Sequence, residues 1–434
     1  MDFQEAYSKG SEAFKQKSFE EARKYLEEAI KLKPNDVYAI NRLAMTYKEL
    51  GDFEAAKSLL GESLDAQKSE GKKEDLYSQY LLGNTYLESG DVDKAIETLS
   101  LTVKENPTDK YARNSLALAY RTKGDYENCL KVLRESDLKN PNDFYNKLSL
   151  ATVLFEDGEV DEAKKYCDII ISKEPNNVQA MVLLGRISID EGDTNKAMKH
   201  FNKVLSIDNN NSDAHYYIGR ILLENDNEDT AREHFNLAMA YSDDKSSILK
   251  NLSMIYYERR DLIKAEEHFT LALGLDEDDG YTLSQYGKLL IELKRPEEAI
   301  KHLKKAISVM PDYSFAYYNL AKAYQEIRDF PNAIYNLMFS LNYEPDDVYS
   351  ANVLGRMFLE VGLNDRALKT FEEILQHDQN DKFAYLGKAE AYFALKQPDK
   401  ANQAITALKA LPLFRSDKVV QEKLSQLLKK YNKE

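Results

Sequence analysis

The pattern of apolar and polar residues repeats along the chain with a fixed period. The segments GDVDKAIETL, GDYENCLKVL, GEVDEAKKYC and GDTNKAMKHF begin at evenly spaced positions, 90, 124, 158 and 192, and a related segment, GDFEAAKSLL, begins at 51. Within each half of the period, apolar residues recur three and four positions apart, which is the spacing of one face of an α-helix. A fixed period of this length is typical of stacked structural repeats rather than of one globular core.

The period divides the chain into twelve repeats, counted from Phe3. Only the second repeat departs from the common length, because it contains an insertion. The predicted repeats are 3–36, 37–75, 76–109, 110–143, 144–177, 178–211, 212–245, 246–279, 280–313, 314–347, 348–381 and 382–415.

Two places in every repeat hold small side chains. The eighth place is Gly, Ala or Ser in all twelve repeats, and the twentieth is Ala in eleven of them and Cys129 in the other. Small side chains in the middle of two consecutive segments allow two helix axes to approach the lower end of the range of roughly 8 to 10 Å. The sequence therefore predicts that each repeat is a pair of packed helices.

The prolines and glycines agree with this division. Proline costs about 3 kcal/mol inside a helix, and all ten prolines lie between repeats, at the start of a second helix or in the final exit loop. A left-handed turn between paired helices is expected at Gly51, Gly90, Gly124, Gly158, Gly192 and Gly362. A different turn geometry is expected where that place holds Asp226, Arg260, Lys294 and Arg328.

Helix pairs of this period with a small eighth place, Ala at the twentieth and Pro at the thirty-second resemble the tetratricopeptide repeat (TPR) family. The resemblance covers residues 3 to about 415 and implies an all-α fold, a right-handed α-solenoid superhelix of helix-turn-helix hairpins whose first helices line a concave groove. The chain departs from the family at the fourth place, often Trp there, since it has no Trp. Unusual local packing is expected where this place holds Gln79, Arg113 and Lys147.

The residues after the last repeat predict a helix that caps the array. Residues 416–434 begin with Ser416 as a candidate N-cap and carry one apolar stripe, Val420, Leu424, Leu427 and Tyr431. A solenoid exposes the core side of its last repeat, and an amphipathic helix covers it. The insertion at 64–75 either lengthens the second helix of its repeat or forms a loop. Because the first repeat starts almost at Met1, no further N-terminal domain is expected.

In proteins of this family, the second, fifth, ninth and thirteenth places project into the groove. The second place is aromatic in two runs on either side of a polar centre: Tyr38, Tyr77, Tyr111 and Tyr145, then Tyr281, Phe315, Tyr349 and Phe383. Aromatic side chains offer a large contact area at a small cost in rotamer entropy, which suits binding of a peptide. The alternative is that each ring simply packs on the preceding repeat.

Two further sets of residues are candidates for contact with a peptide. The ninth place carries a basic row suited to acidic ligands: Arg186, Arg220, Lys288, Lys322 and Arg356. The alternative is that acidic residues at the thirteenth place neutralise this row within each helix. Asn251 and Asn319, at the sixth place, resemble groove asparagines that bond a peptide backbone in several TPR proteins. The family's clamp for chaperone tails cannot be assembled from this sequence.

Features that suggest metal or thiol chemistry have simpler explanations. His200, His234, His268 and His302 recur at the same place of four successive repeats. Neighbouring second helices lie about 10 Å apart, whereas zinc needs its nitrogen ligands at about 2.0 to 2.1 Å. The acidic segment LDEDDG lacks the ligand spacing of a calcium loop, and the two cysteines, Cys129 and Cys167, fall on core places. We expect no metal site, no cofactor and no disulfide.

The composition of the chain excludes some classes of binding partner. The net charge of −15 repels nucleic acid and anionic bilayers at long range. No apolar run approaches the length of a spanning helix, and the first residues lack the apolar region of a secretory signal. The sequence therefore predicts a soluble, cytoplasmic protein without membrane insertion. Since the repeats use nearly the whole chain and no catalytic motif occurs, we expect no enzyme activity.

The leading functional prediction is a non-catalytic scaffold or adaptor that binds a protein or peptide in the concave groove and assembles a multiprotein complex. The alternatives are a regulatory or targeting subunit that recruits a separate catalytic partner, and a sensor of short peptides. A homo-oligomer formed through the aromatic runs or the terminal helix is also open. The sequence does not identify the partner or the pathway.

Overall fold

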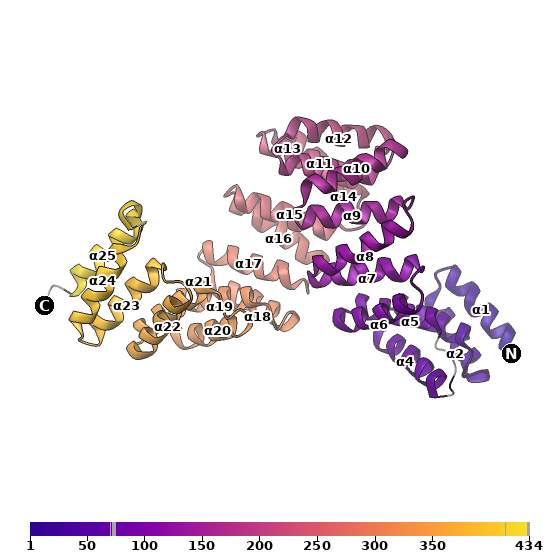
Figure 1. Cartoon of the computed structure of the whole chain (residues 1–434), viewed down its shortest axis with the longest axis horizontal. Coiled ribbons are helices and arrows are strands. Elements are labelled where there is room, and N and C mark those ends of the chain that lie inside the picture. Colours follow the sequence, from indigo (N-terminus) through magenta and orange to yellow (C-terminus); the bar gives the residue numbers. More distant parts are fainter. Residues whose placement is uncertain (70, 72–74, 413, 432–434) are drawn as a thin grey trace. The chain divides into compact units, whose positions relative to one another are not determined.

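The computed structural model describes residues 1–69, 71, 75–412 and 414–431. Helices make up 81% of the described residues, which contain no strand. The chain divides into two compact units, the N-terminal unit Met1–Tyr241 and the C-terminal unit Ser242–Glu434 (Figure 1). The repeat pattern alone did not indicate this division.

The N-terminal unit is a stack of helix hairpins. Each first helix packs on the second helix of its own repeat, and each second helix packs on the next first helix. The helices are α1 (Phe3–Lys15), α2 (Phe19–Leu32), α3 (Val37–Glu49), α4 (Phe53–Ser69), α5 (Leu76–Glu88), α6 (Val92–Glu105), α7 (Lys110–Lys123), α8 (Tyr126–Lys139), α9 (Phe144–Glu156), α10 (Val160–Lys173), α11 (Val178–Asp190), α12 (Thr194–Ile207), α13 (Ser212–Glu224) and α14 (Glu228–Tyr241).

The C-terminal unit is built in the same way and ends with one additional helix. Its helices are α15 (Lys245–Glu258), α16 (Leu262–Leu275), α17 (Gly280–Glu292), α18 (Pro296–Val309), α19 (Ser314–Glu326), α20 (Phe330–Tyr343), α21 (Val348–Glu360), α22 (Asn364–His377), α23 (Lys382–Ala394), α24 (Pro398–Ala410), the 3₁₀ turn η1 (Phe414–Ser416) and α25 (Lys418–Tyr431).

Acidic or amide side chains start most of the first helices. The Asp36 carboxylate accepts a hydrogen bond from the Ala39 backbone N–H at 3.1 Å, and the Asp279 carboxylate accepts one from Thr282 at 2.9 Å. Each such cap contributes about 1 kcal/mol to helix stability. The same role is filled by Asp2, Asp75, Asp109, Asp143, Asn177, Asn211, Asp244, Asp347 and Asp381.

The close approach of paired helices predicted from the small eighth place is confirmed. A Cβ atom built on Gly185 would lie 2.5 Å from the Phe201 ring, and one on Gly355 would lie 2.6 Å from the Phe371 ring. Both phenylalanines are fully buried in the following second helix. In these two hairpins, the helices can pack closely because glycine has no Cβ atom opposite the phenylalanine ring.

The expectation of a second turn geometry is wrong. The glycine turns have left-handed backbone conformations, for example φ 78° at Gly51, but so do the turns that hold a charged residue at that place. Left-handed conformations cost roughly 1 to 2 kcal/mol for residues other than Gly. Hairpin packing enforces them at Lys17 (φ 59°), Asp226 (58°), Arg260 (65°), Lys294 (62°), Arg328 (60°) and Lys396 (57°).

The polar fourth places are buried in the hairpins. Gln79, Arg113 and Lys147 are only 4 to 6% exposed. Arg113 Nη1 donates to the carbonyl oxygen of Pro107 at 2.9 Å, in the loop between repeats, and Tyr317 Oη donates to the equivalent carbonyl of Pro311 at 3.1 Å. Lys147 forms a partly buried ion pair with Asp137. Arg113 and Lys147 thus place polar groups in the core that are bonded at Arg113 Nη1 and at the Lys147 ammonium, whereas the buried Arg113 Nε has no hydrogen-bond partner among the described residues.

The insertion and the last helix are both defined in part. Helix α4 has 17 residues, against 14 in α2, so the insertion lengthens this helix as far as Ser69; residues 70 and 72–74 lie outside the described residues. Helix α25 begins at Lys418, and Asp417 rather than Ser416 caps it, accepting from Val420 N–H at 3.0 Å. Its Val420, Leu424 and Leu427 pack on the core of the last hairpin.

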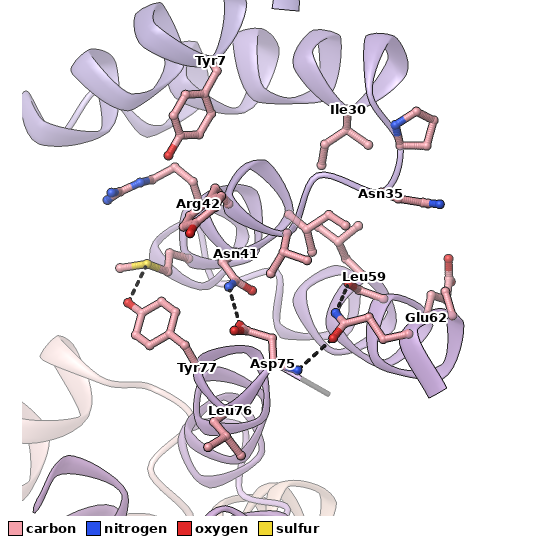
Figure 2. A pocket seen from close by; sticks show the side chains of 18 residues that line it. Tyr7, Ile30, Asn35, Asn41, Arg42, Leu59, Glu62, Asp75, Leu76 and Tyr77 are labelled. Atoms are coloured by element: carbon pink, nitrogen blue, oxygen red, sulfur yellow. Dashed lines mark hydrogen bonds between the residues drawn. The ribbon is translucent and has the colours of Figure 1, made fainter. Parts of the chain in front are cut away.

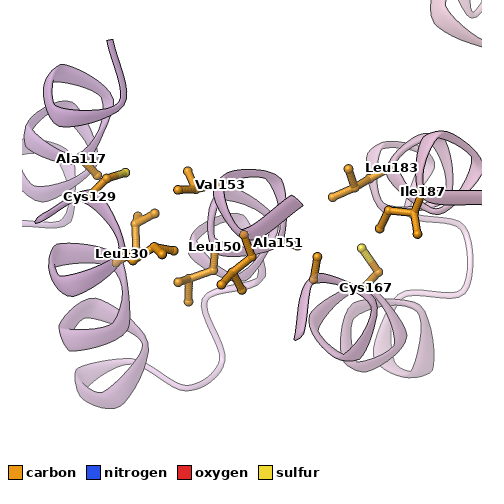
Figure 3. Packing of buried hydrophobic residues seen from close by; sticks show 12 residues of the cluster. Ala117, Cys129, Leu130, Leu150, Ala151, Val153, Cys167, Leu183 and Ile187 are labelled. Carbon is orange, nitrogen blue, oxygen red and sulfur yellow. The ribbon is translucent and has the colours of Figure 1, made fainter. Parts of the chain in front are cut away.

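Both cysteines are part of the apolar core, as predicted. Cys129 and Cys167 are buried in one cluster with residues such as Leu150 and Leu183 (Figure 3). Burial raises the pKa of the Cys129 thiol to about 11 and that of Cys167 to about 12. Neither thiol is an activated nucleophile. Among the described residues, no helix combines the length and apolar character needed to cross a bilayer.

Candidate functional site

A large open cavity lies among the first five helices. It has a volume of about 1120 Å³ and is lined from α1, α2, α3, α4 and α5, with Tyr38 and Tyr77 among its residues (Figure 2). The rings of Tyr7 and Tyr77 come from helices on opposite sides of Arg42 in this view. The cavity is large enough for several side chains of a partner.

The floor of this cavity is polar and ordered by hydrogen bonds. Asn41 Nδ2 donates to the Asp75 carboxylate at 3.2 Å, and the Asp75 backbone N–H donates to Gln67 Oε1 at 2.8 Å (Figure 2). The lengthened helix α4 supplies Gln67, so the insertion contributes to the wall of the cavity. Tyr77 Oη contacts Met45 Sδ at 3.7 Å across the opening.

A smaller cavity follows between α7, α8 and α9 in the same unit. Its volume is about 300 Å³, and Tyr145 and Leu118 lie on its wall. Arg121, also on the wall, forms a bidentate pair with Glu156 at 2.5 and 2.7 Å. The charge at this cavity is therefore neutralised by the protein itself.

Two small cavities of the C-terminal unit share two lining residues. The first, of about 250 Å³, lies between α19 and α21 and is lined by Tyr318, Lys322 and Tyr349 among others. The second, of about 310 Å³, lies between α21, α23 and α25 and includes Lys423. Arg356 and Glu360 line both cavities, so the two adjoin at these residues and together are called the C-terminal site.

The predicted second-place aromatics divide into exposed and partly buried rings. The tyrosines are largely exposed, from 44% at Tyr281 to 77% at Tyr38, and Phe315 and Phe383 are partly buried. Some also touch the preceding repeat, since the Tyr349 ring lies 5.5 Å from that of Tyr318. Such rings lean on the preceding repeat and still present area to solvent, so contact with a peptide at the second place stays a prediction. The exposed set is Tyr38, Tyr77, Tyr111, Tyr145, Tyr281 and Tyr349.

The basic row does not pair with the acidic residues four positions later, except once. Arg220 Nε contacts Glu224 at 3.1 Å within its helix. The other members lie over aromatic rings instead: Arg186 over Phe155 at 5.3 Å, Lys288 over Tyr257 at 4.9 Å, Lys322 over Tyr318 at 5.6 Å and Arg356 over Phe383 at 5.5 Å. The interpretation as a self-neutralised row is therefore wrong for four of five positions.

The two candidate asparagines differ in exposure. Asn251 is exposed on α15, as a ligand contact would require. Asn319 is only 2% exposed, and its Nδ2 donates to the Phe315 carbonyl at 2.8 Å. Its expected contact with a ligand is therefore wrong: the sixth place of this repeat faces the hairpin core.

The histidines form no shared metal site within the described residues. His268 and His302 lie against tyrosines of their own repeats, with ring centroids 5.1 Å from Tyr256 and 4.8 Å from Tyr286. His234 Nδ1 lies 3.0 Å from Nδ1 of buried His215.

Sequence reasoning missed two residues of the C-terminal site. Tyr318 occupies the fifth place, which also faces the groove in the family, so its aromatic character was a usable signal. Lys423 belongs to α25, which lies outside the repeat pattern. Lys423 Nζ lies 5.0 Å from the Phe383 ring, opposite an aromatic second place that the sequence did identify.

Protein-family models match the chain over most of its length. Models described as tetratricopeptide repeat match residues 13–72 and 188–253, and residues 80–137, 148–212 and 352–413. A model described as TPR repeat matches residues 287–327. A search of the curated proteins finds no match.

The solved structures that match this chain include one described as a tetratricopeptide repeat protein. A tetratricopeptide repeat protein from Parabacteroides merdae is 18% identical, with a TM-score of 0.50 over 57% of this chain and 95% of that chain. Yeast Tom70 is 17% identical, with a TM-score of 0.45 over 98% and 99%. The APC/C hetero-tetramer Cut9–Hcn1 is 14% identical, with a TM-score of 0.43 over 90% of this chain and 96% of that chain. Together with the hairpin geometry, the family models show that the chain belongs to the tetratricopeptide repeat family.

Proposed function

We propose that this protein is a non-catalytic scaffold that binds protein partners along the face formed by its first helices. The supporting observation is the set of exposed second-place tyrosines, several of which line cavities. Tyr38 and Tyr77 line the cavity of about 1120 Å³, Tyr145 lines the cavity beside α7, and Tyr349 lines one in the C-terminal unit.

Exposed aromatic rings at the same place of several repeats suit an interface with another protein. Burying apolar surface contributes roughly 25 cal/mol per Å², and aromatic residues are enriched among the residues that dominate binding. A ring already leaning on the preceding repeat loses little freedom on binding. The face therefore offers contact area at several repeats without a large conformational change.

A non-catalytic role fits the chemistry of these cavities. The thiol at the wall of the 300 Å³ cavity, Cys129, has a pKa raised by burial to about 11, so it is not a nucleophile at neutral pH. Arg121, on the wall of the same cavity, forms two hydrogen bonds with Glu156. Neither side chain is therefore free to act on a substrate. The second candidate function is a targeting subunit that recruits a separate enzyme. The same first-helix face would bind the partners of a scaffold or the recruited enzyme.

Site-specific photocrosslinking tests this proposal. A photoreactive phenylalanine would replace Tyr38 or Tyr349 in the full chain, expressed in its own cells. Matched controls would carry it at Leu138 or Ile263, which are 82% and 81% exposed on second helices. We expect defined protein adducts from the tyrosine positions and few from the controls. Mass spectrometry would identify both the adduct and the contact.

The outcome also separates the candidates. Adducts with structural or transport components favour a scaffold, and adducts with an enzyme whose activity co-purifies favour a targeting subunit. Equal labelling from the first-helix and second-helix positions would contradict the proposed binding face. Adducts with a second copy of the chain would instead indicate self-association.

A further inference from the structure

The C-terminal site, formed by the two adjoining cavities between α19, α21, α23 and α25, contains three basic residues that have no acidic partner among the described residues. Lys322, Arg356 and Lys423 make no ion pair within the part of the chain that the structure describes. Cations close by are paired: Lys382 contacts Asp417 at 2.5 Å, and Lys430 contacts Glu390 at 2.8 Å. The protein therefore neutralises basic residues around this site and leaves these three unpaired.

Two of the three cations share one aromatic ring. Arg356 Cζ lies 5.5 Å and Lys423 Nζ 5.0 Å from the centroid of Phe383. Burial lowers the pKa of Lys423, and the neighbouring Arg356 charge lowers it further. Two like charges held together in a partly desolvated place favour an anion between them. A bound carboxylate would replace repulsion by two charge-assisted hydrogen bonds.

The remaining charges do not cancel this positive field. Glu390 is occupied by Lys430, so Glu360 is the one lining carboxylate not taken up by a basic residue among those that the structure describes. The site thus carries three free positive charges and one negative charge, in a chain whose net charge is −15. A local field of opposite sign to the whole protein selects ligands with clustered negative charge.

The shape favours a peptide over a compact anion. The two cavities of about 250 and 310 Å³ are joined at Arg356, and each has room for one or two side chains. Tyr349, 64% exposed, lines the first of them, so apolar surface alternates with the cations. An extended segment can place acidic side chains on the cations and apolar atoms on the rings.

We propose that this site binds an acidic peptide segment, with one carboxylate between Arg356 and Lys423 and another at Lys322. Helix α25 is then part of the binding surface as well as the cover of the last hairpin. This inference deepens the proposed function and rests on it, because it assigns a partner chemistry to one segment of the first-helix face.

Fluorescence anisotropy with two labelled peptides tests the inference. The probe is a blocked ten-residue peptide of alternating Glu and Leu, and the comparison peptide has Gln in place of every Glu. We expect the full chain to bind the Glu peptide at least about tenfold more tightly, with an affinity that falls as salt is raised. The triple variant Lys322→Gln, Arg356→Gln, Lys423→Gln should lose about tenfold or more of this affinity.

A matched triple variant controls for net charge and folding. Lys301→Gln, Lys409→Gln, Lys418→Gln removes the same charge from exposed residues of the same unit, and circular dichroism would establish that both variants fold. Affinity unchanged in this control supports the site. An equal loss in both variants, no preference for Glu over Gln, or tighter binding of a single-stranded oligonucleotide of equal charge would overturn it.

These outcomes are distinct from those of the crosslinking experiment. Adducts at Tyr38 and Tyr349 with no preference for the Glu peptide would preserve the binding face and reject the acidic specificity. The single variant Lys423→Gln gives the sharpest result, since Lys423 is partly exposed on a helix outside the repeats. If it leaves the Glu peptide affinity unchanged, the role of α25 in binding is rejected.

Discussion

The two compact units use the same hairpins but differ in what their first helices present. Exposed second-place tyrosines occur in both. In the N-terminal unit the ninth place is uncharged in the first five repeats, as at Met45, Leu118 and Thr152, and becomes basic only in the last two, at Arg186 and Arg220, whereas in the C-terminal unit it is basic at Lys288, Lys322 and Arg356. The N-terminal unit holds the large cavity of about 1120 Å³, and the C-terminal unit holds the joined basic cavities.

The comparison indicates how one architecture supports different surfaces. Places that contact the hairpin core vary little, because a change there affects packing on both sides. Places on the open side of the first helix are free to change without cost to the core. A single place per repeat therefore changes the charge of the face.

The largest expected effect tests whether the two units are separate in stability. Phe371→Ala should lower the free energy of unfolding of its hairpin by about 3 to 5 kcal/mol, since the ring is fully buried against Gly355. Because each repeat contacts only its neighbours, hydrogen exchange should rise in α21, α22 and α23 and stay unchanged in α11 to α13. Faster exchange throughout the chain would show that the two units unfold together. Phe201→Ala is the matched variant in the N-terminal unit.

The difference in charge can be transferred from one unit to the other. Leu118→Lys with Thr152→Lys places two cations at the 300 Å³ cavity of the N-terminal unit, and we expect the chain to bind the Glu peptide about three- to tenfold more tightly. Leu138→Lys with Ile169→Lys, on exposed positions of second helices, is the control. Equal gains in anisotropy titrations would mean that net charge, rather than the first-helix face, governs affinity.

The turns give a smaller effect. In the N-terminal unit most of the left-handed turns between paired helices hold Gly, whereas in the C-terminal unit most hold a charged residue, as at Lys396. Gly192→Lys should destabilise its hairpin by about 1 kcal/mol, and Lys396→Gly should stabilise its hairpin by somewhat less, because Gly also loses more backbone entropy on folding. Urea unfolding curves measure both. A loss of stability in Lys396→Gly would show that its side chain makes an unrecognised contact.

The smallest expected effect is a shared pH dependence. Burial lowers the pKa of His302 in one unit and of His234 in the other below the ordinary value of 6.5. Between the folded and unfolded pKa values the unfolded chain binds more protons, so stability is full above pH 6.5 and falls as the pH drops through that window. The free energies of unfolding measured well above and well below that window should differ less in His302→Gln than in the wild type. An unchanged difference would assign the pH dependence to other groups.

The repeat places fixed by packing could be predicted from the sequence, and those on the open face could be predicted only in part. Small residues such as Gly185 face a ring in the paired helix, as expected from their periodicity. Periodicity also identified the exposed tyrosines and the basic row. It placed Asn319 on the surface, although this amide bonds the carbonyl one turn earlier in its own helix. The sequence also predicted a second geometry for turns such as that of Lys294, whose left-handed backbone is enforced by the packed helices.

By itself, the sequence determined the helix pairs, their number and their family, because a fixed period of small and apolar places is a local property repeated many times. Only the tertiary structure decided which charges stay unpaired, since Lys288 and Arg356 lie over rings of neighbouring repeats rather than beside acids in their own helices. The meeting of Lys423 with Phe383 was likewise a tertiary result. Contacts between side chains on different helices depend on how those helices stack. The spacing of residues along the sequence does not give the distance between such side chains.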